Sequence, residues 1–255
     1  MNDRPLKFRN IYILTLFCVT GLSFSTDSDA QPYIPTSKTN QVITHAYFTL
    51  SYDERHEQAE WVYYFLTPDR VRGTVPRSDK FREDEAIHNE SARLSDYKGS
   101  GYDRGHLCPA ADNKHAKVAM DESFLMSNMS PQEPSFNRGA WKRLEEQFRE
   151  WAIQHEGLHV VTAGVLTDTL HTIGANRVSI PEYFYKIAYS AADTAMVGVL
   201  MANKKLTGSL TEYIVPVDSI EALTGIDFFP QLEDTLENKL EKEISLKKWI
   251  FTFWE

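Results

Sequence analysis

Strand-like and helix-like segments follow one another without strict alternation, and this order most constrains the fold. Segments rich in β-branched and aromatic residues predict strands at 43–52, 60–66, 159–165, 183–190 and 194–202. Helical patterns occur at 218–223 and 232–242. Because the strands are not separated regularly by helices, the sequence predicts an α+β fold, with a mainly antiparallel central sheet flanked by helices.

The clearest helix is expected after Asn137. Apolar residues recur there with a 3.6-residue period, while most charged residues fall elsewhere. The apolar positions are Trp141, Leu144, Phe148, Trp151 and Ala152. Gly157 is in the right place to end this helix, and residues 67–69 (Thr-Pro-Asp) predict a turn after the second strand.

Residues 1–30 have the layout of a secretory signal peptide. Lys7 and Arg9 precede an apolar run at 11–22, and small and polar residues lead to Ala30. The run is shorter than the roughly 20 residues that span a bilayer, so a permanent anchor is the weaker alternative. The sequence predicts cleavage after Ala30, a secreted or periplasmic protein, and no stable membrane association.

No repeat, low-complexity tract or Gly/Ser linker interrupts the chain after residue 40. Residues 31–255 are therefore predicted to be a single domain, with a core at about 40–230 and a C-terminal helical tail to 255. The aromatic complement of 14 Phe, 12 Tyr and 5 Trp is sufficient for such a core. Cys108 is the one cysteine beyond residue 30, which excludes an internal disulfide.

The net charge of −9 excludes a protein that binds nucleic acid by overall electrostatic attraction. A polyanionic substrate would need a local basic site.

One stretch of the sequence has the residue types that phosphodiester hydrolysis requires. Residues 101–106 read Gly-Tyr-Asp-Arg-Gly-His, and we expect Gly105 to allow an unusual backbone turn. A neutral His106 can act as a base near pH 7. Asn137 offers an amide oxygen to Mg²⁺, although it is also in position to be a helix N-cap. Glu145 lies about two helical turns further on, near the same face, and could hold the ion's waters. From the residue types alone, purely structural roles for His106 and Asn137 remain open.

Several strings together resemble the DNA/RNA non-specific endonuclease family, the endonuclease G-like ββα-metal nucleases. The resemblance extends from about Trp61 to Phe229. The strings that carry it are Asp103-Arg104-Gly105-His106, then Asn128 with Pro131-Gln132, then Asn137 with Trp141 through Glu145. Residues 77–84, which are partly basic, and residues 221–225 resemble flanking parts of the family.

The resemblance implies a metal-dependent endonuclease that hydrolyses DNA and RNA with little sequence preference and leaves 5′-phosphate ends. His106, on the β-hairpin of a ββα-metal finger, is the implied general base. Asn137, at the finger's helix, is the implied direct ligand of Mg²⁺ or Mn²⁺, and Glu145 acts through the ion's water. A homodimer is possible, and the sequence does not indicate an inhibitor or immunity protein.

The family's remaining site residues include basic and amide side chains. Arg77 is the implied contact of the scissile phosphate, although Arg82 competes for this role because both flank Phe81. Arg104 and Asn128 would support the phosphate and the loop geometry.

Two alternative functions remain compatible with the sequence. An exported binding protein with this fold would bind nucleic acid without turnover, and a toxin nuclease would need an immunity partner.

The string His-Glu-Gly-Leu-His at 155–159 matches a zinc protease motif. Gly157 should break the helix that this motif requires, so we expect the two imidazoles to diverge.

The other features are assigned structural roles. Cys108 and the C-terminal aromatic residues at 249–254 are predicted to pack, although stacking of the latter on single-stranded nucleic acid is an alternative. Residues 239–248 are interpreted as a solvated helix face. Surface or capping roles are predicted for His45, His56, His88, His115 and His171.

Overall fold

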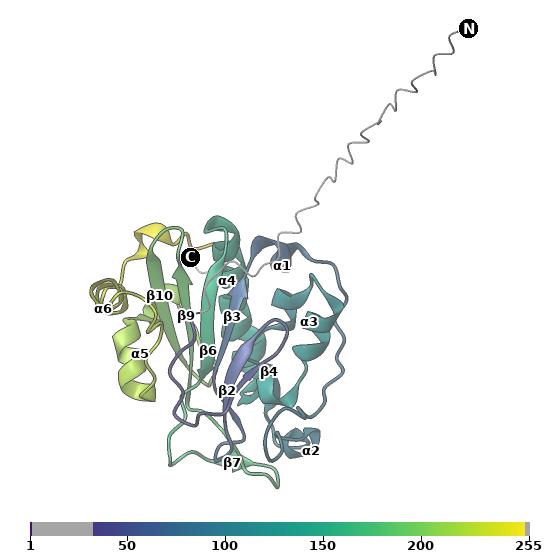
Figure 1. The fold of residues 1–255 in the computed structure, drawn as a ribbon. Helices are drawn as coiled ribbons and strands as arrows, with labels where there is room; N and C mark the ends of the chain where they lie inside the picture. The colour runs from purple at the N-terminus through teal and green to yellow at the C-terminus, as the bar shows by residue number, and fades with distance from the viewer. Residues whose placement is uncertain (2–32, 253–255) are drawn as a thin grey trace. The chain divides into compact units, whose positions relative to one another are not determined.

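A seven-stranded sheet in the order β1-β2-β3-β6-β9-β10-β11 lies at the centre of the computed structural model (Figure 1). The structure describes Met1 and residues 33–252. Every neighbouring pair in this sheet is antiparallel, which confirms the predicted α+β class. The strands are β1 (Val42–Thr44), β2 (Thr49–Asp53), β3 (Gln58–Leu66), β4 (Asp103–His106), β5 (Met129–Gln132), β6 (Leu158–Gly164), β7 (Thr172–Ile173), β8 (Val178–Ser179), β9 (Tyr183–Ser190), β10 (Ala195–Ala202) and β11 (Ile214–Val215).

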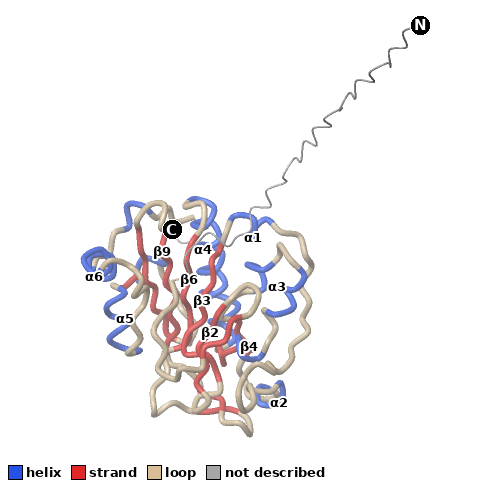
Figure 2. The backbone as a smooth tube through the Cα atoms, viewed as in Figure 1, coloured by secondary structure: helices blue, strands red, loops and turns tan. Residues whose placement is uncertain are grey.

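Helices and loops surround this sheet, and the chain between α1 and β4 is mostly loop (Figure 2). The α-helices are α1 (Pro68–Arg72), α2 (Leu94–Tyr97), α3 (Lys117–Glu122), α4 (Lys142–Gln154), α5 (Val217–Thr224) and α6 (Asp234–Lys242). Short 3₁₀ turns lie at Ala110–Asn113, Met126–Asn128, Leu210–Tyr213 and Leu246–Lys248, and a π-helical turn lies at Phe136–Trp141. Among the described residues, no helix is both long and apolar enough to span a membrane.

The two faces of the sheet are covered by different parts of the chain. On one face, the ring of Trp141 packs 5.7 Å from that of Phe184, beneath α4. Side chains alternate along a strand, so Tyr189 points to the opposite face, where its ring lies 5.2 Å from that of Tyr33. Helix α5 also covers this second face: a Cβ on Gly198 would lie 3.2 Å from the side chain of Ile220. Helices α4 and α5 therefore lie on opposite sides of the sheet.

The amphipathic helix is confirmed, because all five of its predicted apolar positions are at most 1% exposed. Its beginning and end differ from the prediction. Helical backbone starts before Asn137, in the π turn, and α4 ends at Gln154, with positive φ angles at Glu156 and Gly157.

Other local expectations were wrong. The 43–52 segment forms two strands with a reversal between them, in which His45 N–H donates to Phe48 C=O at 2.9 Å. The predicted turn at 67–69 instead starts α1, because the Thr67 hydroxyl accepts from Arg70 N at 3.3 Å and acts as an N-cap. The C-terminal charges do not form one helix face, since α6 ends at Lys242.

Candidate active site

A cavity of about 420 Å³ opens between the β4–β5 pair and the start of α4. Five of the six predicted site residues line it: Arg77, Arg104, His106, Asn137 and Glu145. Two other cavities, of about 270 and 360 Å³, contain none of the six. Predicted site residues that lie up to 68 positions apart in the sequence, from Arg77 to Glu145, therefore meet in one place.

His106 ends β4, which pairs antiparallel with β5 through His106 and Met129. Two neighbouring rings hold the imidazole: the Phe124 ring lies edge-on at 4.9 Å and the Phe81 ring at 5.7 Å. Its Nε2 is covered and makes no hydrogen bond with any described residue. Burial, with the positive charges of Arg77 and Arg104, lowers the pKa of His106 to about 3. The imidazole is therefore neutral at pH 7, the state in which it can accept a proton.

Gly105 has a different role from the one predicted. Its φ is not positive, so it makes no unusual turn. A Cβ at this position would lie 2.2 Å from the side chain of Gln132 on the paired strand. Glycine is required at position 105 because the buried side chain of Gln132, on the neighbouring strand, occupies the space that a Cβ would need.

Asn128 does not line the cavity but supports the loop that follows His106. Its Oδ1 accepts from Cys108 N at 2.8 Å, and its Nδ2 donates to the carbonyls of Cys108 and Ser123 at 2.9 Å. Cys108 is fully buried, as predicted for a packing role, and burial raises the pKa of its thiol to about 11.

Asn137 lies inside the π-helical turn, so the N-cap interpretation is wrong. Glu133 serves as the cap instead, because its carboxylate accepts from Phe136 N at 2.9 Å. The π turn is a rare geometry that is common at functional sites. It leaves the Asn137 side chain half-buried at the cavity, where Nδ2 donates to Asp103 Oδ2 at 2.9 Å. Asp103 is fixed in turn by two bonds from Arg138, at 2.8 and 2.6 Å.

This arrangement is suited to a hard cation. Because Nδ2 of Asn137 is bound to Asp103, the amide oxygen is the free end of the group, and it makes no hydrogen bond to the described residues. Glu145 supplies a carboxylate to the same cavity. Amide and carboxylate oxygens are the ligands that Mg²⁺ uses, and this ion keeps most of its waters. The side chains present therefore fit the expected ion.

Lys186 was missed by the sequence analysis and lies directly beneath the site. It is fully buried on β9, with its ammonium 5.5 Å from the Tyr64 ring, 5.4 Å from Trp141 and 5.6 Å from Phe148. Its ammonium donates a long hydrogen bond to Leu107 C=O, at 3.5 Å. A lysine inside an otherwise apolar strand was the available signal.

Glu145 and Lys186 influence each other. Burial raises the pKa of Glu145 to about 7, while the charges of Lys186 and Arg149 oppose this rise. Burial also lowers the pKa of Lys186, and Glu145 opposes that change. A buried charge is costly without a partner, so Lys186 favours the ionised carboxylate in the cavity.

Asp112 forms a second support that the sequence analysis did not identify. It is fully buried, accepts from Tyr64 OH at 3.0 Å, and forms an ion pair with Arg149 at 2.9 Å. Arg149 lines the cavity. The pair therefore holds one basic side chain in a defined orientation at the edge of the site.

The two competing arginines occupy different positions. Arg77 lines the cavity, with its guanidinium 4.8 Å from the Phe124 ring that also packs on His106. Arg82 is exposed and donates to Asp121 C=O at 2.6 Å, away from the cavity lining. Arg104 lies 4.3 Å over the Phe81 ring, and its covered Nε has no partner among the described residues.

The zinc-type string does not form a metal site. His155 Nδ1 contacts Asp193 at 2.5 Å, beyond the end of α4. His159 lies on β6 and contacts Tyr63 OH at 2.9 Å, with its ring 4.6 Å from that of Tyr33 on the other face of the sheet. The imidazoles diverge, as predicted.

The other structural assignments gave mixed outcomes. The surface or capping role was wrong for His56, which is 6% exposed and bonded to Ser179 at 2.8 Å. Trp249 is buried against Trp151, at 4.9 Å between ring centroids, which supports packing of the tail. Residues 253 and 254 lie outside the described part of the chain, as does the predicted signal peptide at 1–30, apart from Met1.

Comparison with known proteins gives one consistent result. The model of the DNA/RNA non-specific endonuclease family matches residues 28–235. Mitochondrial endonuclease G of Homo sapiens is 33% identical over 202 residues, covering 72% of this chain and 68% of that protein. A nuclease of Nostoc sp. is 32% identical over 228 residues, covering 82% and 81%. A chain in the crystal structure of the EndoG/EndoGI complex has a TM-score of 0.70 and 32% identity, covering 77% of this chain and 88% of that one.

Proposed function

The chain belongs to the DNA/RNA non-specific endonuclease family and is a nuclease; on that premise we propose that it is a metal-dependent endonuclease that hydrolyses DNA and RNA with little sequence preference and leaves 5′-phosphate ends. The proposed base is His106. The proposed direct metal ligand is Asn137, with Mg²⁺ as the ion and Mn²⁺ as a substitute.

The observation that carries this proposal is the concentration of positive charge around one neutral imidazole. The cavity is lined by five basic side chains in a chain whose net charge is −9: Arg77, Arg104, Arg138, Lys142 and Arg149. Such a local site can attract a polyanion that the whole protein would repel. Contacts to phosphates carry no base information, which supports weak sequence preference.

The residues divide the work of hydrolysis between them. The neutral imidazole of His106, which lines the cavity, takes the proton from the attacking water. Arg77 and Arg104 neutralise charge on the phosphoryl oxygens. Asn137 would hold the ion directly and Glu145 would bind its hydration waters; when bound, the ion would add charge neutralisation. Attack of water on phosphorus breaks the P–O3′ bond, the departing O3′ takes a proton from solvent water to become a 3′-hydroxyl, and the phosphate remains on the 5′ end.

The metal assignment is tested by plasmid nicking and RNA digestion in titrated Mg²⁺, with and without chelator. Chelation should abolish wild-type activity. In Asn137→Ala, the Mg²⁺ concentration for half-maximal activity should rise about tenfold or more, because the ion keeps only water-mediated and substrate contacts. Lost bonding to Asp103 should cost about 1 kcal/mol of stability, so activities are compared at equal folded fraction.

Asn176→Ala is the matched control, because Asn176 also donates to an aspartate, Asp96, at 3.1 Å but lies outside the cavity. It should leave the Mg²⁺ dependence unchanged. A wild-type Mg²⁺ curve for Asn137→Ala would remove Asn137 from the metal site. Asn137→Asp is not expected to restore stability, because it loses the donor to Asp103 and brings two carboxylates together.

Turnover separates this proposal from the alternatives. A binding protein without catalysis would retain DNA on a filter in the presence of Mg²⁺ but would leave supercoiled plasmid intact. A toxin nuclease would harm cells that lack an immunity partner. The proposed partners are the DNA and RNA substrates, and a homodimer remains compatible with the proposal.

We also propose export, based on the basic start, the short apolar run and Ala30. Protein made in a secreting host should begin near Gln31 and be recovered in the soluble fraction outside the cytoplasm. N-terminal sequencing measures this directly. An intact Met1 on membrane-bound protein would contradict the proposal. Delivery to mitochondria, the location in the names of several relatives, would contradict it as well.

A further inference from the structure

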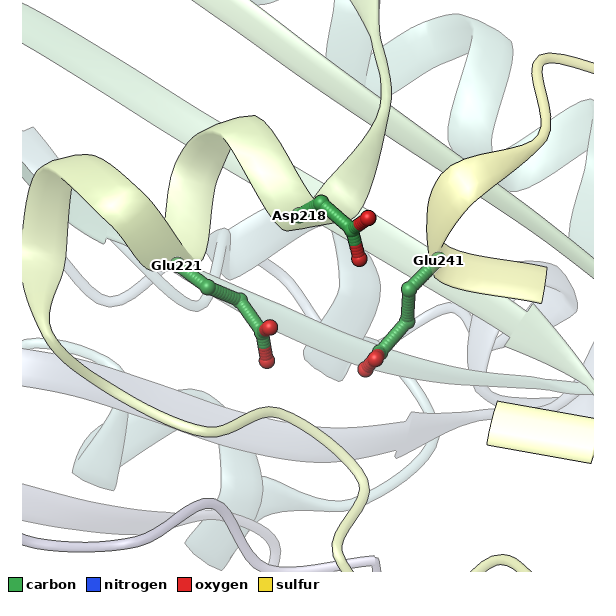
Figure 3. Close-up of side chains that lie close together, drawn as sticks. All are labelled: Asp218, Glu221 and Glu241. Carbon is green, nitrogen blue, oxygen red and sulfur yellow. The ribbon is translucent and has the colours of Figure 1, made fainter. Parts of the chain in front are cut away.

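Three carboxylates come together on the side of the sheet away from the active site. Asp218 and Glu221 lie on α5, Glu241 lies on α6, and their side chains point into a common space (Figure 3). One oxygen from each lies within 4.8 Å of the others. We propose that Asp218, Glu221 and Glu241 bind one divalent cation, with Ca²⁺ preferred, and that this ion ties α6 to α5.

Glu241 is the strongest sign of a missing ligand. The residue is only 5% exposed, yet its Oε1 is covered and has no hydrogen-bond partner among the described residues. A buried carboxylate oxygen without a donor costs free energy that a folded protein normally avoids. Because Glu241 points at Asp218 and Glu221, a cation between the three would supply the absent partner.

The surrounding charge makes the requirement stronger. In the described part of the chain, none of the three carboxylates forms an ion pair with lysine or arginine. The three carboxylates therefore lie together without a basic partner, and a bound cation would supply the missing positive charge.

Glu221 is already held in place for binding. Its Oε1 accepts from Phe228 N at 2.8 Å, which orients the carboxylate and leaves its second oxygen available. Asp218 is exposed, so water can complete the coordination from solvent. The site thus combines one buried, one oriented and one solvent-facing oxygen ligand.

The ligand set favours Ca²⁺. Its three carboxylates come from two helices and differ in exposure: Asp218 is exposed, Glu221 is half-buried and Glu241 is buried. Ca²⁺ accepts irregular carboxylate sets, while Mg²⁺ demands a regular octahedron of ligands.

The test is thermal unfolding of chelator-treated protein in titrated CaCl₂, made in the Asn137→Ala background so that the active-site ion does not contribute. Ca²⁺ at about 100 times its Kd should raise the Tm by about 5 °C or more. Glu241→Gln in that background should lose the shift, and the exposed Asp218→Asn should weaken it. Calorimetric titration with CaCl₂ should detect one binding site in the Asn137→Ala protein and none when Glu241→Gln is added.

Glu243→Gln is the matched control, because it makes the same chemical change at an exposed carboxylate two residues away. It should keep the full Ca²⁺ shift. The proposal is overturned if Ca²⁺ does not raise the Tm, or if Glu241→Gln and Asp218→Asn retain the whole shift. An equal shift with MgCl₂ would overturn the preference for Ca²⁺. With Asn137 intact, Glu241→Gln should keep nuclease activity within about twofold, so failure here leaves the proposed function unaffected.

Discussion

Replacing His106 with Ala is expected to lower turnover of plasmid DNA and RNA by about 10²-fold or more, the usual loss when a general base is removed. The reason is that His106 presents a neutral imidazole to a cavity that contains Arg77, Arg104 and the expected metal ligand Asn137. Circular dichroism and thermal unfolding should show a folded protein. Nicking rates measured in saturating Mg²⁺ give the comparison.

The low pKa of His106 adds a second readout. The unfolded chain binds this proton near pH 6.5, whereas the folded protein binds it only near pH 3. The unfolded state therefore holds more protons between these values, so the stability contributed by neutral His106 is lost as the pH falls from about 6.5 towards 3. His106→Ala should make stability less sensitive to acid in this window, as measured by urea unfolding at several pH values.

His56→Ala provides the crossed control. His56 is buried and bonded to Ser179, outside the cavity, so this change should reduce stability but keep turnover per folded molecule. Near-wild-type nicking by a folded His106→Ala protein would refute the assignment of the base. Loss of activity in both variants at equal folded fraction would also count against it.

Removing the charge of Lys186 is expected to make activity strongly dependent on pH. The pKa of Glu145 is about 7 with Lys186 in place, and losing a neighbouring positive charge should raise it by about one unit or more. In Lys186→Met the Mg²⁺ concentration for half-maximal activity should therefore rise about tenfold at pH 6.5. The difference should narrow by pH 8.5, where Glu145 again ionises.

This pH dependence distinguishes electrostatic positioning from simple packing. A packing defect would lower activity by the same factor at every pH. Lys38→Met is the matched control: Lys38 donates to Thr224 C=O at 3.0 Å, outside the active-site cavity, and its variant should keep the wild-type Mg²⁺ curve. Glu145→Gln should lose activity without recovery at high pH, because the amide cannot ionise. A Lys186→Met curve parallel to wild type at all pH values would contradict the proposed role.

Local patterns identified much of the molecule. The prediction for β9 matches its bounds, and the buried face of α4 was correct at every named position, because periodic burial leaves a direct trace in the order of residues. The site was identified mainly from the order of several short strings. Residue types alone left structural roles open for His106 and Asn137, since the same side chains are also common caps and core residues.

The wrong sequence predictions concern residues whose role is decided by contacts with other residues of the chain. Thr67 caps a helix instead of forming a turn, Asn137 lies in a π turn already capped by Glu133, and Gly105 is set by the side chain of Gln132. In each case the role of the residue depends on a contact with another residue, which the short string does not specify.

The sequence by itself determined the class of fold, the buried face of the long helix and the strings that build the nuclease site, because each has a local period or order. Only the tertiary structure brought Lys186 beneath Glu145 and joined Asp218 and Glu221 to Glu241. These contacts depend on strand order, register and the face from which each helix approaches the sheet. No local pattern encodes them, since the free energy of a buried charge is set by neighbours that the chain brings together only on folding.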